Sequence, residues 1–275
     1  MGQSAVARRG LTMRSRPTAA AIAQPLISVS IVSHGHASAL GVLLKSLALH
    51  EPADRVQLIV TDNLGDDLPE AQPGPWHSLV TLRNARPRGF ASNHNAAFQS
   101  ASGTFFCVLN PDVVFLEGVF HKLAERLDQG EGDIAAPVLI DSRGAVQDSY
   151  RRLPSPRDLV ARRLGIGAAW TKPADGALLY PDWIAGTFML MPSSVFARLE
   201  GFDSRYRLYF EDVDFCTRAR LLGLTVLVDA GLRLRHDPHR ASRRLGRSLY
   251  WHVRGALRFF ASDVYRRARL IESHA

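Results

Sequence analysis

Cysteines and long apolar runs are both scarce in this sequence, and each shortage excludes a class of protein. Only two of the 275 residues are cysteines, Cys107 and Cys216, which is too few for a disulfide framework and favours a reducing compartment. No run of about eighteen apolar residues occurs, which argues against a transmembrane helix. The Ala-rich stretch 19–23 is too short and too weakly apolar for a signal peptide. We therefore expect a cytosolic protein whose residues 1–24 form a disordered tail.

A net positive charge is also absent from most of the chain, although the whole carries a net charge of +8. Residues 233–269 contain eleven Arg, no Lys and two Asp, a net charge of +9 that leaves −1 for the remainder. A basic segment of this kind indicates an anionic partner, whether lipid headgroups, nucleic acid or a phosphorylated substrate.

Strand-like and helix-like segments alternate from Ile27 onwards, which predicts an α/β domain with a mostly parallel sheet flanked by helices. We expect this domain over residues 25–240, followed by a basic amphipathic helix within 241–275. The expected strands are 28–33, 57–62, 79–83, 104–109, 134–140, 145–150, 183–191, 225–228 and 232–236. The expected helices are 37–49, 91–101, 116–127, 193–199 and 212–222, and a long loop is expected over 151–182.

The apolar strand 104–109 ends abruptly in Asn110-Pro111-Asp112. In an open α/β sheet, ligands bind outside the carboxyl ends of the strands. Mg²⁺ and Mn²⁺ are held there by one or two carboxylates plus substrate phosphates, so Asp112 is a candidate metal ligand. A β-turn with proline at its second position explains the same residues without any ligand.

Two other strands also end in polar residues. Asp62 and Asn63 follow an apolar strand and suit a ribose or nucleobase, with a strand-capping turn as the alternative. His236 follows the last expected strand, where an imidazole suits Mn²⁺, although a lone His at a strand end is more often a surface hydrogen-bonding group.

Three carboxylates lie within four residues in Glu211-Asp212-Val213-Asp214, at the start of an expected helix. Acidic side chains at the start of a helix interact favourably with the helix dipole, so helix stability alone can explain their presence. Asp212 and Asp214 cannot point the same way in a helix, so at least one carboxylate can face a cleft and act as a general base.

Taken in order, six blocks resemble the inverting family 2 glycosyltransferases with the GT-A fold. Asn-Pro-Asp in place of the usual Asp-x-Asp is similar to the rhamnosyltransferase-like branch, which uses dTDP-L-rhamnose. The sequence departs from the pattern at Ser33-His34-Gly35, where the family usually has Thr-Tyr-Asn, and at Ser204, where Glu is common. The blocks are 29–33, 59–63, 88–95, 109–112, 183–186 and 201–203 leading to 210–214.

The resemblance implies a role for each matching residue. Asp212 matches the catalytic base with Glu211 as its neighbour, and Asp112 with His236 matches the site of a divalent metal, Mn²⁺ or Mg²⁺. Trp183 and Gly186 match the acceptor side. The residues that match the nucleotide-sugar side are Ser33, Asp62, Asn63, Gly89, Asn95 and Asn110.

The implied reaction is transfer of a sugar to a lipid-linked or polysaccharide acceptor, with a UDP- or GDP-sugar donor or a non-catalytic nucleotide-sugar-binding protein as alternatives. From Leu245, apolar residues and arginines fall on opposite helix faces, which suits an anionic membrane surface at the inner face of the cytoplasmic membrane. The alternative is that the apolar stripe packs on the domain. Nucleic acid is the less favoured partner because no recognised binding module surrounds the arginines.

Overall fold

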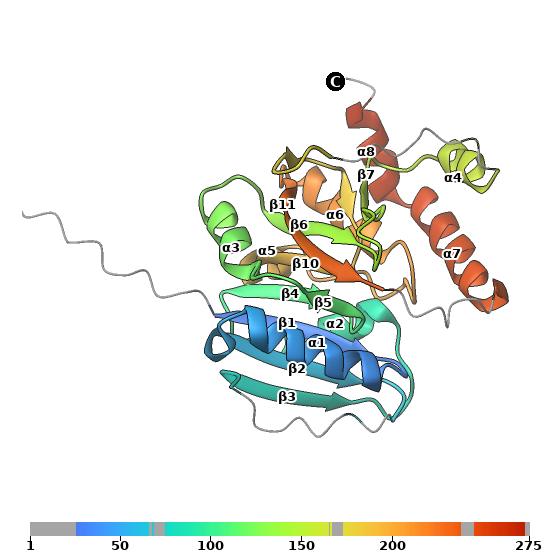
Figure 1. Cartoon of the computed structure of the whole chain (residues 1–275). Coiled ribbons are helices and arrows are strands. Elements are labelled where there is room, and N and C mark those ends of the chain that lie inside the picture. The colour runs from blue at the N-terminus through green and yellow to red at the C-terminus, as the bar shows by residue number, and fades with distance from the viewer. Residues whose placement is uncertain are drawn as a thin grey trace, which may run out of the picture.

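The protein, described as a computed structural model, is built on a nine-stranded sheet with helices against it (Figure 1). The structure describes residues 26–65, 68, 75–164, 166, 173–237 and 245–272. The expected disordered tail, residues 1–24, lies outside the described residues. The strand order is β3-β2-β1-β4-β10-β6-β11-β5, with β8 paired to β11.

One half of the sheet is parallel, and its strands begin and end within one residue of the predicted positions. Three of these strands, 27–33, 56–62 and 105–109, are almost wholly buried, as expected where a sheet is covered on both faces, whereas the edge strand 78–83 is partly exposed. The register pairs Ser33 with Asp62 and Ile31 with Leu109, so the carboxyl ends of three strands meet at one edge. The four strands are β1 (Ile27–Ser33), β2 (Val56–Asp62), β3 (Ser78–Arg83) and β4 (Phe105–Leu109).

The other half of the sheet is mixed. Since β10 runs antiparallel to β4 and β6, its first residue lies at the carboxyl edge of the parallel strands. β11 is parallel to β6, so its last residue, His236, lies at that edge as well. These strands are β5 (Val113–Phe115), β6 (Ile134–Ile140), β8 (Leu178–Leu179), β10 (Phe188–Pro192) and β11 (Val226–His236).

Three strand predictions are wrong. The single strand expected at 183–191 is divided into β9 (Trp183–Ile184) and β10, which belong to different sheets. The two strands expected at 225–236 are the single strand β11, whose register shifts between Asp229 and Arg233. The strand expected at 145–150 does not form; residue Val146 makes one bridge to Ile140. A separate two-stranded sheet pairs β7 (Tyr150–Arg151) with β9 (Trp183–Ile184).

The helix predictions hold in position but not at every boundary. The helix expected from residue 116 begins at Phe120, because the buried Glu51 carboxylate accepts the N–H groups of Val119 and Phe120 at its start. The loop expected over 151–182 contains a helix, α4. The helices are α1 (Ala37–His50), η1 (Ala53–Arg55), α2 (Phe90–Phe98), α3 (Phe120–Asp128), α4 (Pro156–Arg163), α5 (Ser193–Arg198) and α6 (Glu211–Leu221).

The basic C-terminal segment forms two helices rather than one, α7 (Leu245–Phe260) and α8 (Asp263–Glu272). Ser262 separates them, because its hydroxyl oxygen accepts the Tyr265 N–H and caps α8. Both helices contribute to a second apolar cluster, distinct from the core of the sheet. Its buried members are Leu153, Tyr206, Phe210, Val213, Ala256, Phe259 and Ala268.

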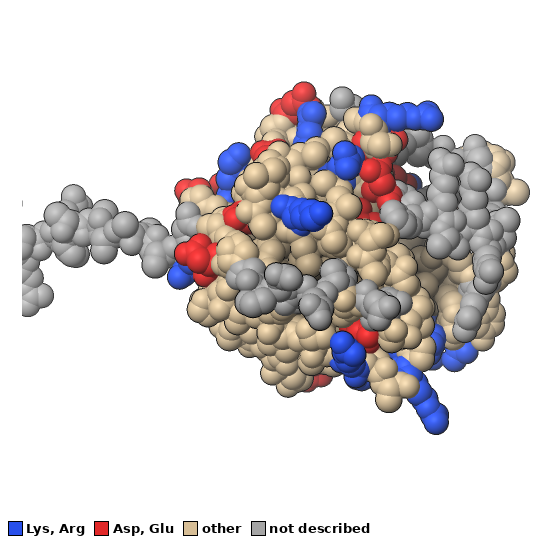
Figure 2. All heavy atoms as spheres, turned by 60° about the horizontal axis from the view of Figure 1, so that its bottom comes forward, with Lys and Arg blue, Asp and Glu red and all other residues tan. Residues whose placement is uncertain are grey.

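Figure 2 shows the bottom of the molecule in Figure 1 turned toward the viewer, and charges of both signs occur on this face. In Figure 2 the described Lys and Arg side chains on this face are scattered among Asp, Glu and uncharged residues. This dispersal agrees with the sequence, in which the positive excess belongs to the C-terminal segment.

Candidate active site

Gly186 and Thr187, just before β10, connect the two acidic motifs. The Gly186 N–H donates to Asp212 Oδ2 at 3.1 Å, and the Thr187 carbonyl accepts the Asn110 N–H at 2.9 Å. The structure therefore brings the start of α6 and the Asn110-Pro111-Asp112 turn to the same edge of the sheet. A Cβ on Gly186 would lie 2.9 Å from the Phe90 ring, so only glycine fits at this contact.

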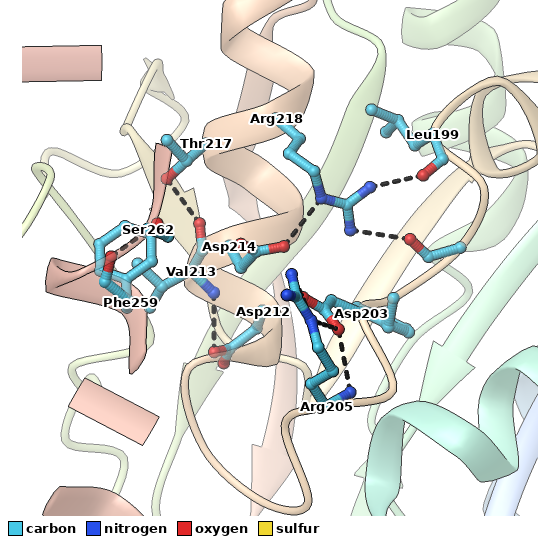
Figure 3. Close-up of polar contacts among 12 residues, drawn as sticks. Leu199, Asp203, Arg205, Asp212, Val213, Asp214, Thr217, Arg218, Phe259 and Ser262 are labelled. Carbon is cyan, nitrogen blue, oxygen red and sulfur yellow. Dashed lines mark hydrogen bonds and ion pairs between the residues drawn. The ribbon is translucent and has the colours of Figure 1, made fainter. Parts of the chain in front are cut away.

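The three carboxylates of the Glu211-Asp212-Val213-Asp214 motif have different surroundings. Asp214 is buried in an ion pair with Arg218, which also donates to two carbonyl groups (Figure 3). Glu211 is 4% exposed, and its Oε2 has no hydrogen-bond partner among the described residues. Asp212 is partly exposed and held by the N–H groups of Gly186 and Val213. Asp212 is thus the member best placed to meet a substrate.

Burial raises the pKa of two of these carboxyl groups, Asp212 and Glu211. It raises the pKa of Asp212 above the ordinary aspartate value, against the N–H groups of Gly186 and Val213, which lower it. Burial, and then the negative charge of Asp212, raises the pKa of Glu211. A carboxylate whose pKa is raised in this way is a stronger base, which suits removal of a hydroxyl proton.

Glu211→Gln is expected to stabilise the protein increasingly as the pH rises from about 5 to about 8. Because its folded-state pKa is raised, Glu211 binds more protons in the folded than in the unfolded state over this window, so its contribution to stability is lost with rising pH. The gain in unfolding free energy should reach about 2 kcal/mol. Urea denaturation at several pH values measures it. Glu125→Gln, at an exposed carboxylate of α3, serves as control, and a pH-independent gain for Glu211→Gln would contradict the assignment.

Asp112 and His236 meet at the carboxyl edge, as the sequence suggested. His236 Nε2 lies 3.4 Å from Asp112 Oδ1. Gln147 fixes the imidazole, since its Nε2 donates to the His236 carbonyl at 2.6 Å and its Oε1 lies 2.7 Å from Nδ1. With Nδ1 donating to Gln147, the Nε2 lone pair faces the Asp112 carboxylate, so a metal ion could be bound by both groups.

The oxygen and imidazole nitrogen of this pair suit Mn²⁺. No group of three or more His, Cys, Asp or Glu side chains able to hold a metal occurs among the described residues. A metal held by Asp112 and His236 would therefore take its remaining ligands from substrate oxygens or water, as expected for Mg²⁺ and Mn²⁺ at diphosphates.

The residues expected to bind the nucleotide lie at the carboxyl edge of the parallel strands, but several of them form hydrogen bonds within the protein. Asp62 is 1% exposed and its Oδ1 accepts the N–H groups of Leu64 and Gly65, which is the strand-capping turn that the sequence left open. Ser33 is buried and its hydroxyl oxygen accepts the His36 N–H. Contact of Asp62 with a ribose or base stays a prediction.

Asn63, expected in the nucleotide pocket, forms hydrogen bonds within the protein, and its contact with a nucleotide stays a prediction. Its Nδ2 donates to the Arg88 carbonyl at 3.0 Å and contacts His34 Nδ1 at 2.8 Å. Its Oδ1 accepts the Arg88 N–H and an N–H of Asn84, each at 2.8 Å. The amide is saturated by these contacts, so Asn63 shapes the loop that ends at Arg88.

Asn95 and Gly89 are also explained by the packing of the chain. Asn95 Nδ2 donates to the Phe202 carbonyl at 2.7 Å, and Asn95 Oδ1 accepts the Phe202 N–H at 2.9 Å. A Cβ on Gly89 would lie 2.7 Å from the Arg207 carbonyl oxygen. These two residues position α2 against the segment that leads to α6. Trp183, expected near the acceptor, donates its indole N–H to the Arg152 carbonyl at 3.1 Å.

Gln147 and the pair Tyr209-Phe210 belong to the site but were not found from the sequence. Gln147 lies in a segment without secondary structure of its own and gave no signal. Tyr209 and Phe210 have left-handed backbones, with φ of 69° and 70°, directly before Glu211. Strain of this kind gathers at functional sites, but bulky residues carry no sequence signal for it.

The chain is similar to known glycosyltransferases. The family model described as glycosyl transferase family 2 matches residues 28–174. Identity is 27% over 248 residues with rhamnosyltransferase WbbL of Escherichia coli (strain K12), covering 86% of this chain and 93% of the relative. It is 30% over 170 residues with N-acetylglucosaminyl-diphospho-decaprenol L-rhamnosyltransferase of Mycobacterium tuberculosis (strain ATCC 25618 / H37Rv), covering 56% and 54%.

Two solved structures share the fold. The structure of GalNAc-T7 with UDP, GalNAc and Mn²⁺ aligns with a TM-score of 0.60 at 15% identity, over 78% of this chain and 44% of the other. The mannosyltransferase PcManGT of Pyrobaculum calidifontis, in complex with GDP-Man and Mn²⁺, aligns with a TM-score of 0.59 at 17% identity, over 86% and 65%. The fold is therefore GT-A, as predicted. With the motifs, the sheet and the family model in agreement, this chain belongs to glycosyl transferase family 2, is a glycosyltransferase and is rhamnosyltransferase-like.

Proposed function

We propose that this glycosyltransferase is a metal-dependent inverting enzyme that transfers L-rhamnose from dTDP-L-rhamnose to a hydroxyl of a lipid-linked or polysaccharide acceptor. The observation that carries the proposal is a pair of hydrogen bonds, one donated by Gly186 to Asp212 and one accepted by Thr187 from Asn110, which joins Asp212 to the Asn110-Pro111-Asp112 turn. Two relatives named as rhamnosyltransferases support the donor, and the lipid-linked substrate in the name of one of them supports the acceptor.

Asp212 would accept the proton of the acceptor hydroxyl as that oxygen attacks the anomeric carbon. The Gly186 and Val213 N–H groups orient its carboxylate. Asp112 and His236 would hold the divalent metal, with Gln147 orienting the imidazole. When bound, that metal supplies electrostatic stabilisation of the negative charge on the departing diphosphate. Asn110 would lie on the nucleotide side of the same turn.

A panel of dTDP-, UDP- and GDP-sugars, each tested for thermal stabilisation with and without Mn²⁺, identifies the donor. We expect dTDP-L-rhamnose to stabilise the protein only when Mn²⁺ is present, by about 2.7 kcal/mol at a hundredfold excess over its dissociation constant. Stronger stabilisation by a UDP- or GDP-sugar would show that this nucleotide sugar, and not dTDP-L-rhamnose, is the donor. Binding without transfer to any acceptor would favour the non-catalytic alternative.

We further propose that α7 lies on an anionic membrane surface at the cytoplasmic face, where a lipid-linked acceptor is found. The structure separates two apolar faces on this helix. Ala256 and Phe259 are buried against the domain, whereas Leu249, Val253 and Leu257 are 40%, 47% and 66% exposed. Exposed apolar residues beside arginines suit an interfacial helix. No described helix is long and apolar enough to cross a bilayer.

Replacing Leu249 and Leu257 together by Ser is expected to weaken binding to phosphatidylglycerol vesicles about tenfold or more, since two apolar side chains leave the interface. Co-sedimentation at low and high salt measures the binding. Leu49→Ser, at a 77% exposed position on α1, is the matched control and should bind as the wild type does. Equal binding by the double variant and the wild type would exclude α7 as the contact.

A further inference from the structure

We infer that α7 positions the catalytic motif: its contact at Gly255 holds the left-handed Tyr209-Phe210 turn that aims Asp212. This inference rests on the proposed function in one respect, that Asp212 is the base. It gives the C-terminal helix a role in catalysis that is separate from any membrane contact, because the two roles use different faces of the helix.

The turn before α6 is strained and needs an external support. Tyr209 and Phe210 are consecutive residues with φ near +70°, a conformation that side chains with a Cβ rarely adopt. The Phe210 carbonyl accepts the Asp214 N–H at 2.9 Å, so this turn starts α6 directly. Any change in the turn therefore moves Glu211 and Asp212, the next two residues of the chain.

Helix α7 supplies that support. A Cβ on Gly255 would lie 2.6 Å from the Tyr209 carbonyl oxygen and 3.3 Å from the Phe210 ring, so the helix backbone touches the turn. The Tyr209 hydroxyl lies 2.8 Å from Ser248 Oγ. The His252 ring packs on both aromatic rings, with centroid distances of 5.4 and 5.3 Å.

The same segment is tied to the opposite side of the site. The Arg207 carbonyl accepts the Phe90 N–H at 2.9 Å. The Arg207 guanidinium carbon lies over the Trp251 ring of α7, 5.5 Å from the ring centroid. Phe90 in turn packs against Gly186, which donates to Asp212. The segment 206–210 is thus held between α7 and the residues that orient the base.

Gly255→Ala, compared with Gly246→Ala, tests the inference. Both changes exchange Gly for Ala in α7, but a Cβ at Gly246 meets nothing within 4 Å. We expect Gly255→Ala to lower kcat about 100-fold while the donor KM stays near the wild-type value, since a displacement of about 1 Å at a catalytic group has that effect. Gly246→Ala should retain wild-type kcat and KM.

A folded Gly255→Ala protein with wild-type kcat would overturn the inference, as would equal losses in kcat and donor affinity. If Gly255→Ala does not fold, His252→Ala decides, because it removes ring contacts with the turn and inserts nothing; a lower kcat with unchanged donor binding supports the inference and an unchanged kcat refutes it. The proposed base is tested separately. If Asp212→Asn retains transfer, the base assignment has failed, whatever Gly255→Ala does.

Discussion

Asp212→Asn is expected to lower kcat by about 10²–10⁴-fold while donor binding is largely retained. Asparagine has the same shape as aspartate, and its single amide oxygen can still accept the N–H of Gly186 or of Val213, so one of the two contacts that hold the side chain should persist. It cannot accept the proton of the acceptor hydroxyl. Steady-state kinetics with the donor identified by the nucleotide-sugar panel, together with calorimetric titration of that donor, separates the two quantities.

Asp214→Asn is the informative comparison, because Asp214 is two residues away but forms an ion pair with Arg218 at 2.8 Å. Breaking this buried pair should lower the unfolding midpoint, since Arg218 loses its partner, with a smaller effect on kcat than Asp212→Asn has. Transfer by Asp212→Asn at close to the wild-type rate would remove the assignment of the base.

Asp112→Ala is expected to weaken metal-dependent nucleotide binding by more than about 100-fold. Loss of an outer hydrogen-bond partner of a metal ligand typically costs 10–100-fold in metal affinity, and loss of the ligand itself should exceed that. Gln147→Ala, which removes the partner of His236 Nδ1, should therefore fall in the range of about 10–100-fold. Electron paramagnetic resonance of bound Mn²⁺ in the presence of nucleoside diphosphate measures both.

The proposed metal site is tested by whether Asp112→Ala loses more Mn²⁺ binding than Gln147→Ala. Asp54→Ala, which removes an exposed carboxylate near the amino end of β2, should leave Mn²⁺ binding unchanged. Undiminished Mn²⁺-dependent binding by Asp112→Ala would show that the metal is held elsewhere. A larger loss for Gln147→Ala than for Asp112→Ala would reverse the roles of ligand and supporting residue.

The parallel strands could be predicted closely because apolar residues run together or alternate in each of them, and β1, β2 and β4 are almost wholly buried. The segments that follow the parallel strands were harder to predict. Strand β5 has only three residues, Val113–Phe115, and was not foreseen. The start of α3 is set by the Glu51 carboxylate, which lies 68 residues earlier in the chain. Such a contact leaves no mark in a local pattern.

The candidate site shows the same division. Asp112 and His236 were found because polar residues that end apolar strands are conspicuous, and their meeting agrees with the edge at which such strands end. Asn63 and Asn95 were placed in the nucleotide pocket by resemblance. Their contact with a nucleotide stays a prediction, but the structure adds hydrogen bonds to main-chain groups of Arg88 and Phe202, which only the folded chain brings within reach.

The sequence by itself determined the parallel half of the sheet, the family and the identity of the acidic motifs, because burial and strand ends follow from residues that are near neighbours in the sequence. Only the tertiary structure showed how the surroundings of the three carboxylates in the Glu211-Asp212-Val213-Asp214 motif differ. Arg218 neutralises Asp214, burial encloses Glu211, and Gly186 orients Asp212. Each of these effects depends on which atoms surround the carboxylate in space, and for Gly186 and the helix α7 those atoms come from distant parts of the chain.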